Sequence, residues 1–309
     1  MKIITLTLNP ALDKSTTLEQ LQSEKKLRCT TPIYEPGGGG INISRAIKIL
    51  GGNSMAIYAA GGSAGKKIHE LLSREGIEQK WIKTKNSTRE NFVVLEKSTN
   101  HQYRFGMPGK ELYSEEQQEV MEAIQNLPSD VEFIAGSGSL PPGVPADFYG
   151  KVAQKAKDRK IKCLIDTSGE ALIQAAKMGL CIMKPNLGEL SKLVGKDEIS
   201  GFEQEKIARE IIHQGKAEIL FVSMGARGAM LATKDRIEYV IPPTVKQKST
   251  VGAGDSMVAG ILLSLSKGEK LYEALKWGVA AGTAATMTPG TELCRKEDAE
   301  EIYSWLNTK

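Results

Sequence analysis

Short apolar segments alternate with amphipathic ones along most of this chain, and this alternation constrains the fold more than any other feature. Apolar segments of strand length lie at residues 2–8, 54–60, 131–137, 161–167, 181–185 and 218–224. They mostly lack polar alternation, which is typical of strands covered on both faces. Helical periodicity lies between them, at residues 41–50, 65–75, 115–127, 147–158, 187–195 and 204–214. The pattern predicts an α/β fold with a mostly parallel central sheet and helices on both faces.

Two segments, residues 14–35 and 88–106, interrupt this alternation because they are polar, prone to form strands and without companion helices. We expect them to form a small separate sheet attached to the main layer. No internal repeat or low-complexity linker divides the chain, and 309 residues are enough to bury a large core. Length alone allows one large domain or two small ones within residues 1–309.

Composition narrows the classes of function. The chain is 40% apolar and 25% charged, as in an ordinary soluble globular protein. No apolar run is long enough to span a bilayer and the N-terminus has no signal-peptide pattern, so we expect a cytoplasmic protein with no membrane partner. The net charge is +4, but basic residues are interleaved with acidic ones. A small anionic ligand explains this charge, and no continuous basic stretch indicates nucleic acid.

The unusual residues lie in turns next to the predicted strands. These turns are NPALD at 9–13, PGGGGIN at 36–42, GSLPPG at 138–143, KPNLGEL at 184–190 and MGARG at 224–228. In an open α/β sheet, ligands bind at the carboxyl ends of the strands. Any one of these turns alone would be read as a connecting loop. Five of them together favour a binding site.

A sixth stretch, STVGAGDSMVAG at 249–260, predicts a buried helix that begins on glycines. Glycine costs about 1 kcal/mol relative to alanine inside a helix. The first turn of a helix, however, presents unpaired N–H groups and a partial positive charge, and glycines let an anion approach them. Gly252, Ala253 and Gly254 would form such an anion hole. Asp255 is then either a helix cap or a carboxylate placed against a hydroxyl that attacks a phosphate.

Other readings of the glycine-rich turns are weaker. GGSAGKK at 61–67 departs from a P-loop in its glycine spacing, and Lys67 stands where a serine or threonine should hold magnesium. GSGSLPPG at 136–143 has Pro141 where a dinucleotide fingerprint needs glycine. The three histidines, His69, His101 and His213, lie in no catalytic motif. His-based catalysis is therefore not expected.

Taken in order along the chain, GGGGIN, GSLPPG, KPN..EL, VS.G..G and TVGAGDSMVAG resemble the ribokinase-like family of carbohydrate kinases. The resemblance covers essentially the whole chain. It implies a single α/β domain whose small sheet, at about 14–35 and 88–106, is a lid that pairs with its copy in a homodimer. It also implies a site between sheet and lid that takes a phosphosugar, ATP, Mg²⁺ and K⁺.

The resemblance also implies roles for individual residues. The catalytic base and the anion hole before it are Asp255, Gly252, Ala253 and Gly254. The sugar hydroxyls are held by Asp13, Gly38, Gly39 and Asn42. The sugar's own phosphate meets Arg89, Arg104 and Ser139, with Lys26 and Arg28 of this lid or the neighbouring subunit's lid nearby. The nucleotide and its Mg²⁺ meet Lys184, Asn186, Glu189, Ser223, Gly225, Gly228, Val279 and Thr283. Potassium is held in the segments that contain Ser249, Val251, Ala285, Thr288 and Gly290.

Elementary chemistry agrees with some of these roles. A phosphate dianion favours the forked donors of arginine, and Arg89 and Arg104 lie in lid strands that could pair and place both guanidinium groups on one face. The alternative is a solvated strand face. Asn186 and Glu189 are three residues apart, so they share a helix face and could hold magnesium through its waters. The alternative there is a helix cap followed by a surface glutamate.

One position bears on the substrate. Similar kinases that act on tagatose 6-phosphate or fructose 1-phosphate carry a lysine where this chain has Gly39. Without that cation, the phosphate must be held elsewhere, which favours fructose 6-phosphate. We therefore expect ATP-dependent phosphorylation of its 1-hydroxyl. The alternatives are a tagatose-6-phosphate kinase, a 1-phosphofructokinase, and a sensor that binds the same ligands without turnover.

Overall fold

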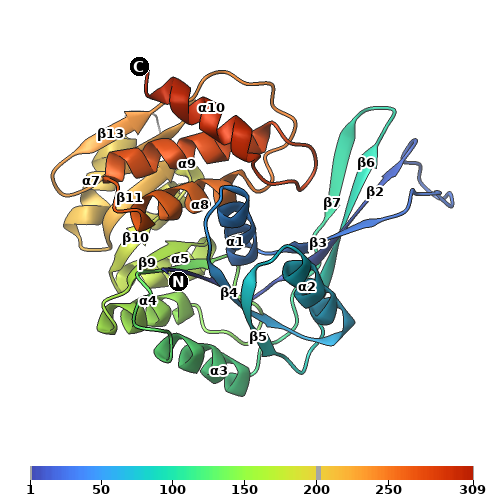
Figure 1. Ribbon diagram of the computed structural model, residues 1–309, viewed down its shortest axis with the longest axis horizontal. Helices are drawn as coiled ribbons and strands as arrows, with labels where there is room; N and C mark the ends of the chain where they lie inside the picture. Colours follow the sequence, from blue (N-terminus) through green and yellow to red (C-terminus); the bar gives the residue numbers. More distant parts are fainter. Residues whose placement is uncertain (1, 200–202, 309) are drawn as a thin grey trace.

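A long twisted sheet runs through the middle of the computed structural model, which describes residues 2–199 and 203–308. In the described part its strands follow the order β13-β12-β11-β10-β9-β8-β1-β4-β5 (Figure 1). Their bounds are β1 Ile3–Thr7, β4 Met55–Ala60, β5 Glu78–Lys83, β8 Phe133–Ser137, β9 Lys162–Asp166, β10 Leu180–Met183, β11 Ala217–Ser223, β12 Ala229–Ala232 and β13 Ile237–Val240. Neighbours are parallel except at β11–β12 and β12–β13. The predicted mostly parallel sheet is confirmed.

Helices cover both faces of this sheet, as predicted (Figure 1). One face carries α1 Gly39–Ile49, α2 Gly62–Arg74, α8 Ala253–Ser266, α9 Leu271–Thr286 and α10 Lys296–Leu306. The other carries α3 Ser114–Gln125, α4 Phe148–Asp158, α5 Gly169–Lys177, α6 Leu187–Leu193 and α7 Gln204–His213. Successive side chains of β1 point to opposite faces of the sheet. Ile3 packs into the apolar cluster on one face and Ile4 into the cluster on the other.

Three strands of the sheet have no counterpart in the sequence prediction. The outer strand β5 reads EQKWIK and is partly exposed, so its polar residues hide the apolar signal. β12 and β13 have four residues each, and the periodicity of such short segments carries little information. All three lie at or next to the ends of the strand order, outside the six predicted strands.

The predicted lid is a separate four-stranded sheet that projects from the body (Figure 1). Its strands follow the order β3-β2-β6-β7, with bounds β2 Ala11–Leu18, β3 Ile33–Gly37, β6 Arg89–Glu96 and β7 His101–Phe105. The sheet therefore begins slightly earlier and extends slightly further than residues 14–35 suggested. The central pair β2–β6 is parallel, and the two outer pairs are antiparallel.

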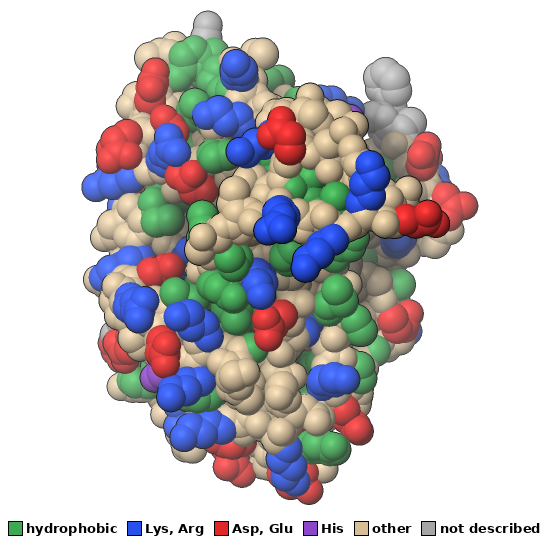
Figure 2. All heavy atoms as spheres, turned by 90° about the vertical axis from the view of Figure 1, so that its right-hand side faces the viewer, with side chains coloured by type: hydrophobic (Ala, Val, Ile, Leu, Met, Phe, Trp, Pro, Cys, Tyr) green, Lys and Arg blue, Asp and Glu red, His purple; other side chains and the backbone are tan. Residues whose placement is uncertain are grey.

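The surface on the lid side carries no block of one charge. On this face, basic side chains lie among acidic and polar ones, with hydrophobic side chains visible between them (Figure 2). Within residues 2–199 and 203–308, no helix combines the length and apolar character that a membrane crossing requires.

Candidate active site

Two helices of one face, α1 and α8, begin close together at the carboxyl edge of the sheet. Gly252 precedes α8 with φ +70°, a left-handed conformation that favours glycine. At Gly39, which begins α1, a Cβ atom would lie 2.1 Å from Ser137 Oγ. Gly252 therefore allows the left-handed turn before α8, and Gly39 allows the start of α1 to pack closely against Ser137. These roles add to the access for an anion that the sequence indicates.

Asp255 lies in the first turn of α8 and faces α1. Its Oδ2 accepts a hydrogen bond of 2.9 Å from Asn42 Nδ2, in the first turn of α1. The residue that caps α8 is Gly252, and no side-chain capping bond is formed there, so the geometry does not favour the helix-cap reading of Asp255. The structure thus brings together two predicted residues that are distant in sequence.

The environment of Asp255 sets its proton affinity. Burial raises the pKa of its carboxyl from 3.8 to about 7, and the negative charge of Asp166 also raises it. The hydrogen bond from Asn42 and the positive charge of Lys184 act in the opposite direction. A carboxyl group with a pKa near neutrality is suited to accept a proton from a substrate hydroxyl.

Lys184 is buried beside this carboxyl. Its Nζ lies 3.2 Å from Oδ1 of Asp166, at the end of β9. Burial alone would lower the pKa of Lys184, but Asp166, Glu189 and Asp255 outweigh it and the pKa is raised. The ammonium group also lies 3.7 Å from the place a Cβ would take at Gly254. A permanent positive charge therefore faces the predicted anion hole.

Asp166 is a further residue of the candidate site, which the sequence analysis did not single out. It ends the apolar segment IKCLIDT, and a carboxylate at the carboxyl end of a buried parallel strand is the signal that could have found it. Its ion pair with Lys184 is largely buried, since the two side chains are 14% and 5% exposed.

Asn186 and Glu189 form a capping box at the start of α6. The backbone N–H of Glu189 donates to Asn186 Oδ1, and the backbone N–H of Asn186 donates to Glu189 Oε2, each at 2.9 Å. The helix cap of the alternative reading is therefore present, but Glu189 is partly buried and is not a surface glutamate. Burial raises the pKa of the Glu189 carboxyl, with the backbone hydrogen bond from Asn186 opposing the shift.

The donor set here suits magnesium only in part. Asp166 and Glu189 provide carboxylate oxygens next to Lys184, yet no three His, Cys, Asp or Glu side chains of the described residues are grouped closely enough to hold a metal ion. Mg²⁺ commonly keeps several waters and shares phosphate oxygens with its protein site. The residues therefore fit a magnesium ion that arrives with a nucleotide.

The remaining predicted nucleotide residues lie at two places. Ser223, Gly225 and Gly228 follow β11, and Ser223 pairs with Asn186 through an isolated bridge, so this turn adjoins the capping box. Val279 and Thr283 lie on α9. Val279 is buried in an apolar cluster and Thr283 is partly exposed. The structure therefore places Val279 in the core.

The lid contributes a row of polar residues on one face. Register places Asp13 between Glu35 of β3 and Asn91 of β6. Asn91, which the sequence analysis did not single out, donates a 2.8 Å hydrogen bond to Asp13 Oδ1 and accepts one from the backbone N–H of Met107. Burial raises the pKa of Asp13, opposed by Asn91 and supported by Glu35.

The two predicted phosphate arginines share this face, as their register requires. Arg89 stands two residues before Asn91, and Val93 of the same strand pairs with Arg104. Their surroundings differ. Arg89 donates to the backbone carbonyls of residues 9, 10 and 107 at 3.0, 3.4 and 3.0 Å. Arg104 is exposed and donates to Gln102 Oε1.

Three further residues predicted to bind the sugar's own phosphate lie at different distances from this face. Ser139 follows β8 and accepts a 3.0 Å hydrogen bond from Asn9 Nδ2, so it adjoins the base of the lid. Lys26 and Arg28 are exposed in the loop between β2 and β3, toward the projecting end of the lid (Figure 1). Within one chain, Ser139 therefore lies close to the candidate site, whereas Lys26 and Arg28 lie apart from it.

The predicted potassium segments are in contact. The hydroxyl of Ser249 donates to the carbonyl of Gly290 at 2.7 Å, and the backbone N–H of Val251 donates to Ser249 Oγ at 3.2 Å. Thr288, fully buried, donates its hydroxyl to the carbonyl of Ala285 at 2.7 Å. Carbonyl oxygens keep a second lone pair when they accept one hydrogen bond. These neutral oxygen ligands fit a monovalent cation.

Comparison with known proteins assigns the family. The chain matches the model of the pfkB family carbohydrate kinases over residues 6–298. It is 42% identical over 308 residues to the ATP-dependent 6-phosphofructokinase isozyme 2 of Escherichia coli, with 99% of each chain covered. The chain therefore belongs to the pfkB family of carbohydrate kinases, and the resemblance seen in the motifs is confirmed.

Solved structures agree with this assignment. Phosphofructokinase-2 from Escherichia coli in complex with potassium superposes with a TM-score of 0.95 at 42% identity, covering 99% of both chains. The same enzyme in complex with fructose-6-phosphate gives a TM-score of 0.93 at 41% identity, again covering 99% of both chains.

Proposed function

We propose that this chain is an ATP-dependent 6-phosphofructokinase that converts fructose 6-phosphate to fructose 1,6-bisphosphate in glycolysis. The observation that carries the proposal is the position of Asp255 at the start of α8, bound to Asn42 and next to Lys184. The 41–42% identity with 6-phosphofructokinases bearing this name or bound to this sugar phosphate supports it. A sensor without turnover gains nothing from a partly buried carboxylate placed against phosphates.

In this proposal, the 1-hydroxyl of fructose 6-phosphate attacks the γ-phosphorus of ATP. The bond from that oxygen to phosphorus forms, the bond to the β-phosphate oxygen breaks, and ADP leaves. Asp255 orients the hydroxyl and accepts its proton, while the N–H groups from Gly252 to Gly254 and the charge of Lys184 stabilise the transferred group. Magnesium, held at Glu189 and Asp166 with the nucleotide, would neutralise phosphate charge.

The lid side of the site would bind the phosphosugar. Asp13, Gly38, Gly39 and Asn42 would hold its hydroxyls, and Arg89, Arg104 and Ser139 its phosphate. The arginine donors match a phosphate dianion. A potassium ion held by carbonyls of the segments around Ser249 and Gly290 would order the neighbouring anion hole.

We further propose that the chain forms a homodimer through the lid and acts in the cytoplasm, where ATP and phosphosugars are present. Ile33 at the start of the edge strand β3 is 66% exposed and shares the lid face of Asp13. An exposed apolar side chain on the edge strand of a projecting sheet favours contact with another copy. Lys26 and Arg28 of the partner would then approach the phosphosugar.

Comparing substrates tests the proposed reaction. ADP release is measured with fructose 6-phosphate, tagatose 6-phosphate and fructose 1-phosphate at equal concentrations. We expect fructose 6-phosphate to have the highest kcat/KM. At Gly39, a lysine side chain would collide with Ser137 Oγ, so this chain has no room there for the cation of the alternative kinases. A higher kcat/KM with either other sugar would select that alternative, and no turnover with any would favour the sensor.

The lid arginines provide a second test. Arg104→Ala should raise the KM for fructose 6-phosphate by roughly ten- to a hundredfold, because a hydrogen bond to a charged group contributes about 1.5–3 kcal/mol. The KM for ATP should change little. Arg89→Ala should act in the same direction, although it also removes donors to three carbonyls. Arg236→Ala, which removes an exposed arginine from β12–β13, is the control. Unchanged phosphosugar KM in both lid variants would place the phosphate elsewhere.

A further inference from the structure

The lid rests on the proposed cation segments at both of its edges. Its two edge strands are β3 and β7. On β3, Glu35 accepts a hydrogen bond from the hydroxyl of Thr291, which directly follows Gly290. On β7, Arg104 Nη2 lies 3.5 Å from Ser249 Oγ. The sheet that carries Asp13 is therefore joined by side chains to the loop expected to hold potassium.

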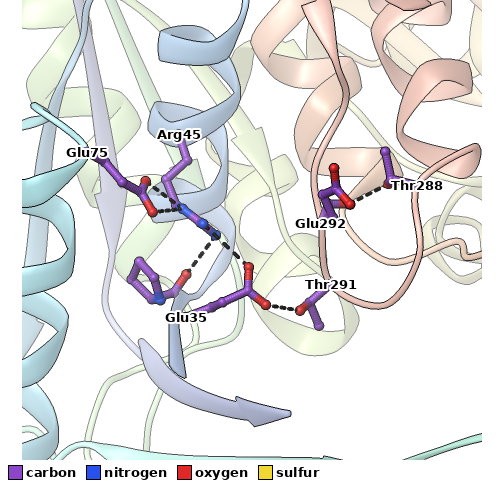
Figure 3. A network of polar contacts seen from close by, with 7 residues as sticks. Glu35, Arg45, Glu75, Thr288, Thr291 and Glu292 are labelled. Atoms are coloured by element: carbon purple, nitrogen blue, oxygen red, sulfur yellow. Dashed lines mark hydrogen bonds and ion pairs between the residues drawn. The ribbon is translucent and has the colours of Figure 1, made fainter. Parts of the chain in front are cut away.

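Glu35 is fixed from the opposite side by α1. Arg45 Nη2 lies 3.6 Å from Glu35 Oε1, and Arg45 Nε donates to both oxygens of Glu75 at 2.8 and 3.1 Å (Figure 3). The side chains of Glu35 and Arg45 are 23% and 13% exposed, so solvent screens their interaction only partly. The Thr291 hydroxyl is thus one of two anchors on this carboxylate.

The position of Glu35 matters to the sugar side of the site. Glu35 pairs directly with Asp13 across β2–β3, so their side chains stand on the same face of the lid. Both are acidic, and the charge of Glu35 raises the pKa of Asp13. Arg45 is also one turn from Asn42 on α1. A shift of Glu35 would therefore change the alignment and charge around two residues proposed to hold sugar hydroxyls.

We propose that Thr291 and Glu35 are positioning residues through which occupation of the cation site strengthens phosphosugar binding. A cation bound by the loop orders Thr291, Thr291 holds Glu35, and Glu35 sets β3 against Asp13. The inference rests on the proposed function and adds a coupling between its two ligands. Such a coupling is reciprocal, so bound phosphosugar must increase the affinity for the cation by the same factor.

Calorimetry without nucleotide separates this coupling from catalysis. Fructose 6-phosphate is titrated into the protein in potassium chloride and in tetramethylammonium chloride at equal ionic strength. We expect at least about fivefold tighter binding in potassium, the lower end of typical coupling between sites. Equal binding in the two salts would overturn the inference alone. No binding in either salt would instead contradict the proposed substrate.

Two substitutions at one position identify the hydroxyl as the link. Thr291→Val keeps the side-chain shape and removes the donor, and should bring the potassium advantage below about twofold. Thr291→Ser keeps the donor and should retain the advantage of the parent. A valine variant that keeps the full advantage, or a serine variant that loses it, would refute the role of the hydroxyl.

A matched control excludes a general effect of losing a threonine hydroxyl. Thr233, in the turn between β12 and β13, accepts a 3.3 Å hydrogen bond from the backbone N–H of Arg236. This turn lies at the end of the central sheet opposite to the carboxyl ends of its parallel strands. Thr233→Val should keep the potassium advantage. If it lost the advantage as Thr291→Val does, the effect would be one of general stability and the inference would fail.

Discussion

Replacing Asp255 by asparagine is expected to lower kcat by about a hundredfold or more, while both substrates bind within a few-fold of the parent. Asparagine keeps the shape of the side chain and an oxygen that can accept from Asn42, but it cannot take a proton. The glycine turn before it is unchanged. Steady-state rates of ADP release, with KM for ATP and fructose 6-phosphate, measure the effect.

The chain offers a closely matched control for this substitution. Asp298 is the third residue of α10, as Asp255 is of α8, and it is not among the residues proposed to bind a ligand. Asp298→Asn should leave kcat within about twofold. If Asp255→Asn were equally silent, the carboxylate would be no more than part of a helix terminus and the sensor hypothesis would be preferred.

Stability should not explain the loss in Asp255→Asn. Folding raises the pKa of this carboxyl from 3.8 to about 7, so the folded protein binds the proton more tightly than the unfolded chain. The contribution of Asp255 to stability is therefore full below about pH 4 and is lost as the pH rises through about 7. Asparagine carries no charge at any of these pH values, so the variant should be at least as stable as the parent at pH 8.

Lys184→Met is expected to lower kcat/KM for ATP by about a hundredfold or more, the usual cost of losing one preorganised group that stabilises developing charge. It also leaves Asp166 buried without its cation, which should cost about 3–5 kcal/mol of stability. Lys184 lowers the pKa of Asp255, so its removal should move the acid limb of the pH–kcat/KM profile above the parent value near 7.

A second variant separates these two effects. In Lys184→Met with Asp166→Asn, the buried pair is removed together, so stability in chemical denaturation should recover while activity stays low. Lys162→Met, at the exposed beginning of β9, should change neither quantity. Unchanged kcat/KM for ATP in Lys184→Met would remove this residue from the nucleotide side of the proposed site.

The central sheet could be predicted because its strands are apolar on both faces and are separated by periodic helices. Asp255 could be singled out because glycines before a buried helix need a reason. Asp166 and Asn91 escaped notice because a single acid or amide in a strand has no local signature. Their importance comes from a neighbour in another segment: Lys184, which follows β10, for Asp166, and Asp13 on β2 for Asn91.

The lid illustrates the same limit. Its polar, strand-prone segments predicted a second sheet, but the parallel pairing of β2 with β6 joins residues 78 apart, and register of that kind depends on contacts that the local pattern does not contain. The link from Glu35 to Thr291 spans 256 residues and was equally inaccessible. The positions of helices and strands could be predicted from the sequence. The contacts between residues on different helices and strands could not.

The attachment of the lid has a mechanical consequence. Asp13 and Arg89 lie near the base of the lid, where β2 and β6 leave the body, whereas Leu18 lies at the far end of β2. At about 3.3 Å per residue, Asp13 is about 7 Å and Leu18 about 23 Å from the start of β2. Swinging the lid by about 10° about that pivot would displace Asp13 by about 1 Å and Leu18 by about 4 Å. A swing of this size would therefore open the tip of the lid by several ångströms, while the carboxylate proposed to hold the sugar stays almost in register.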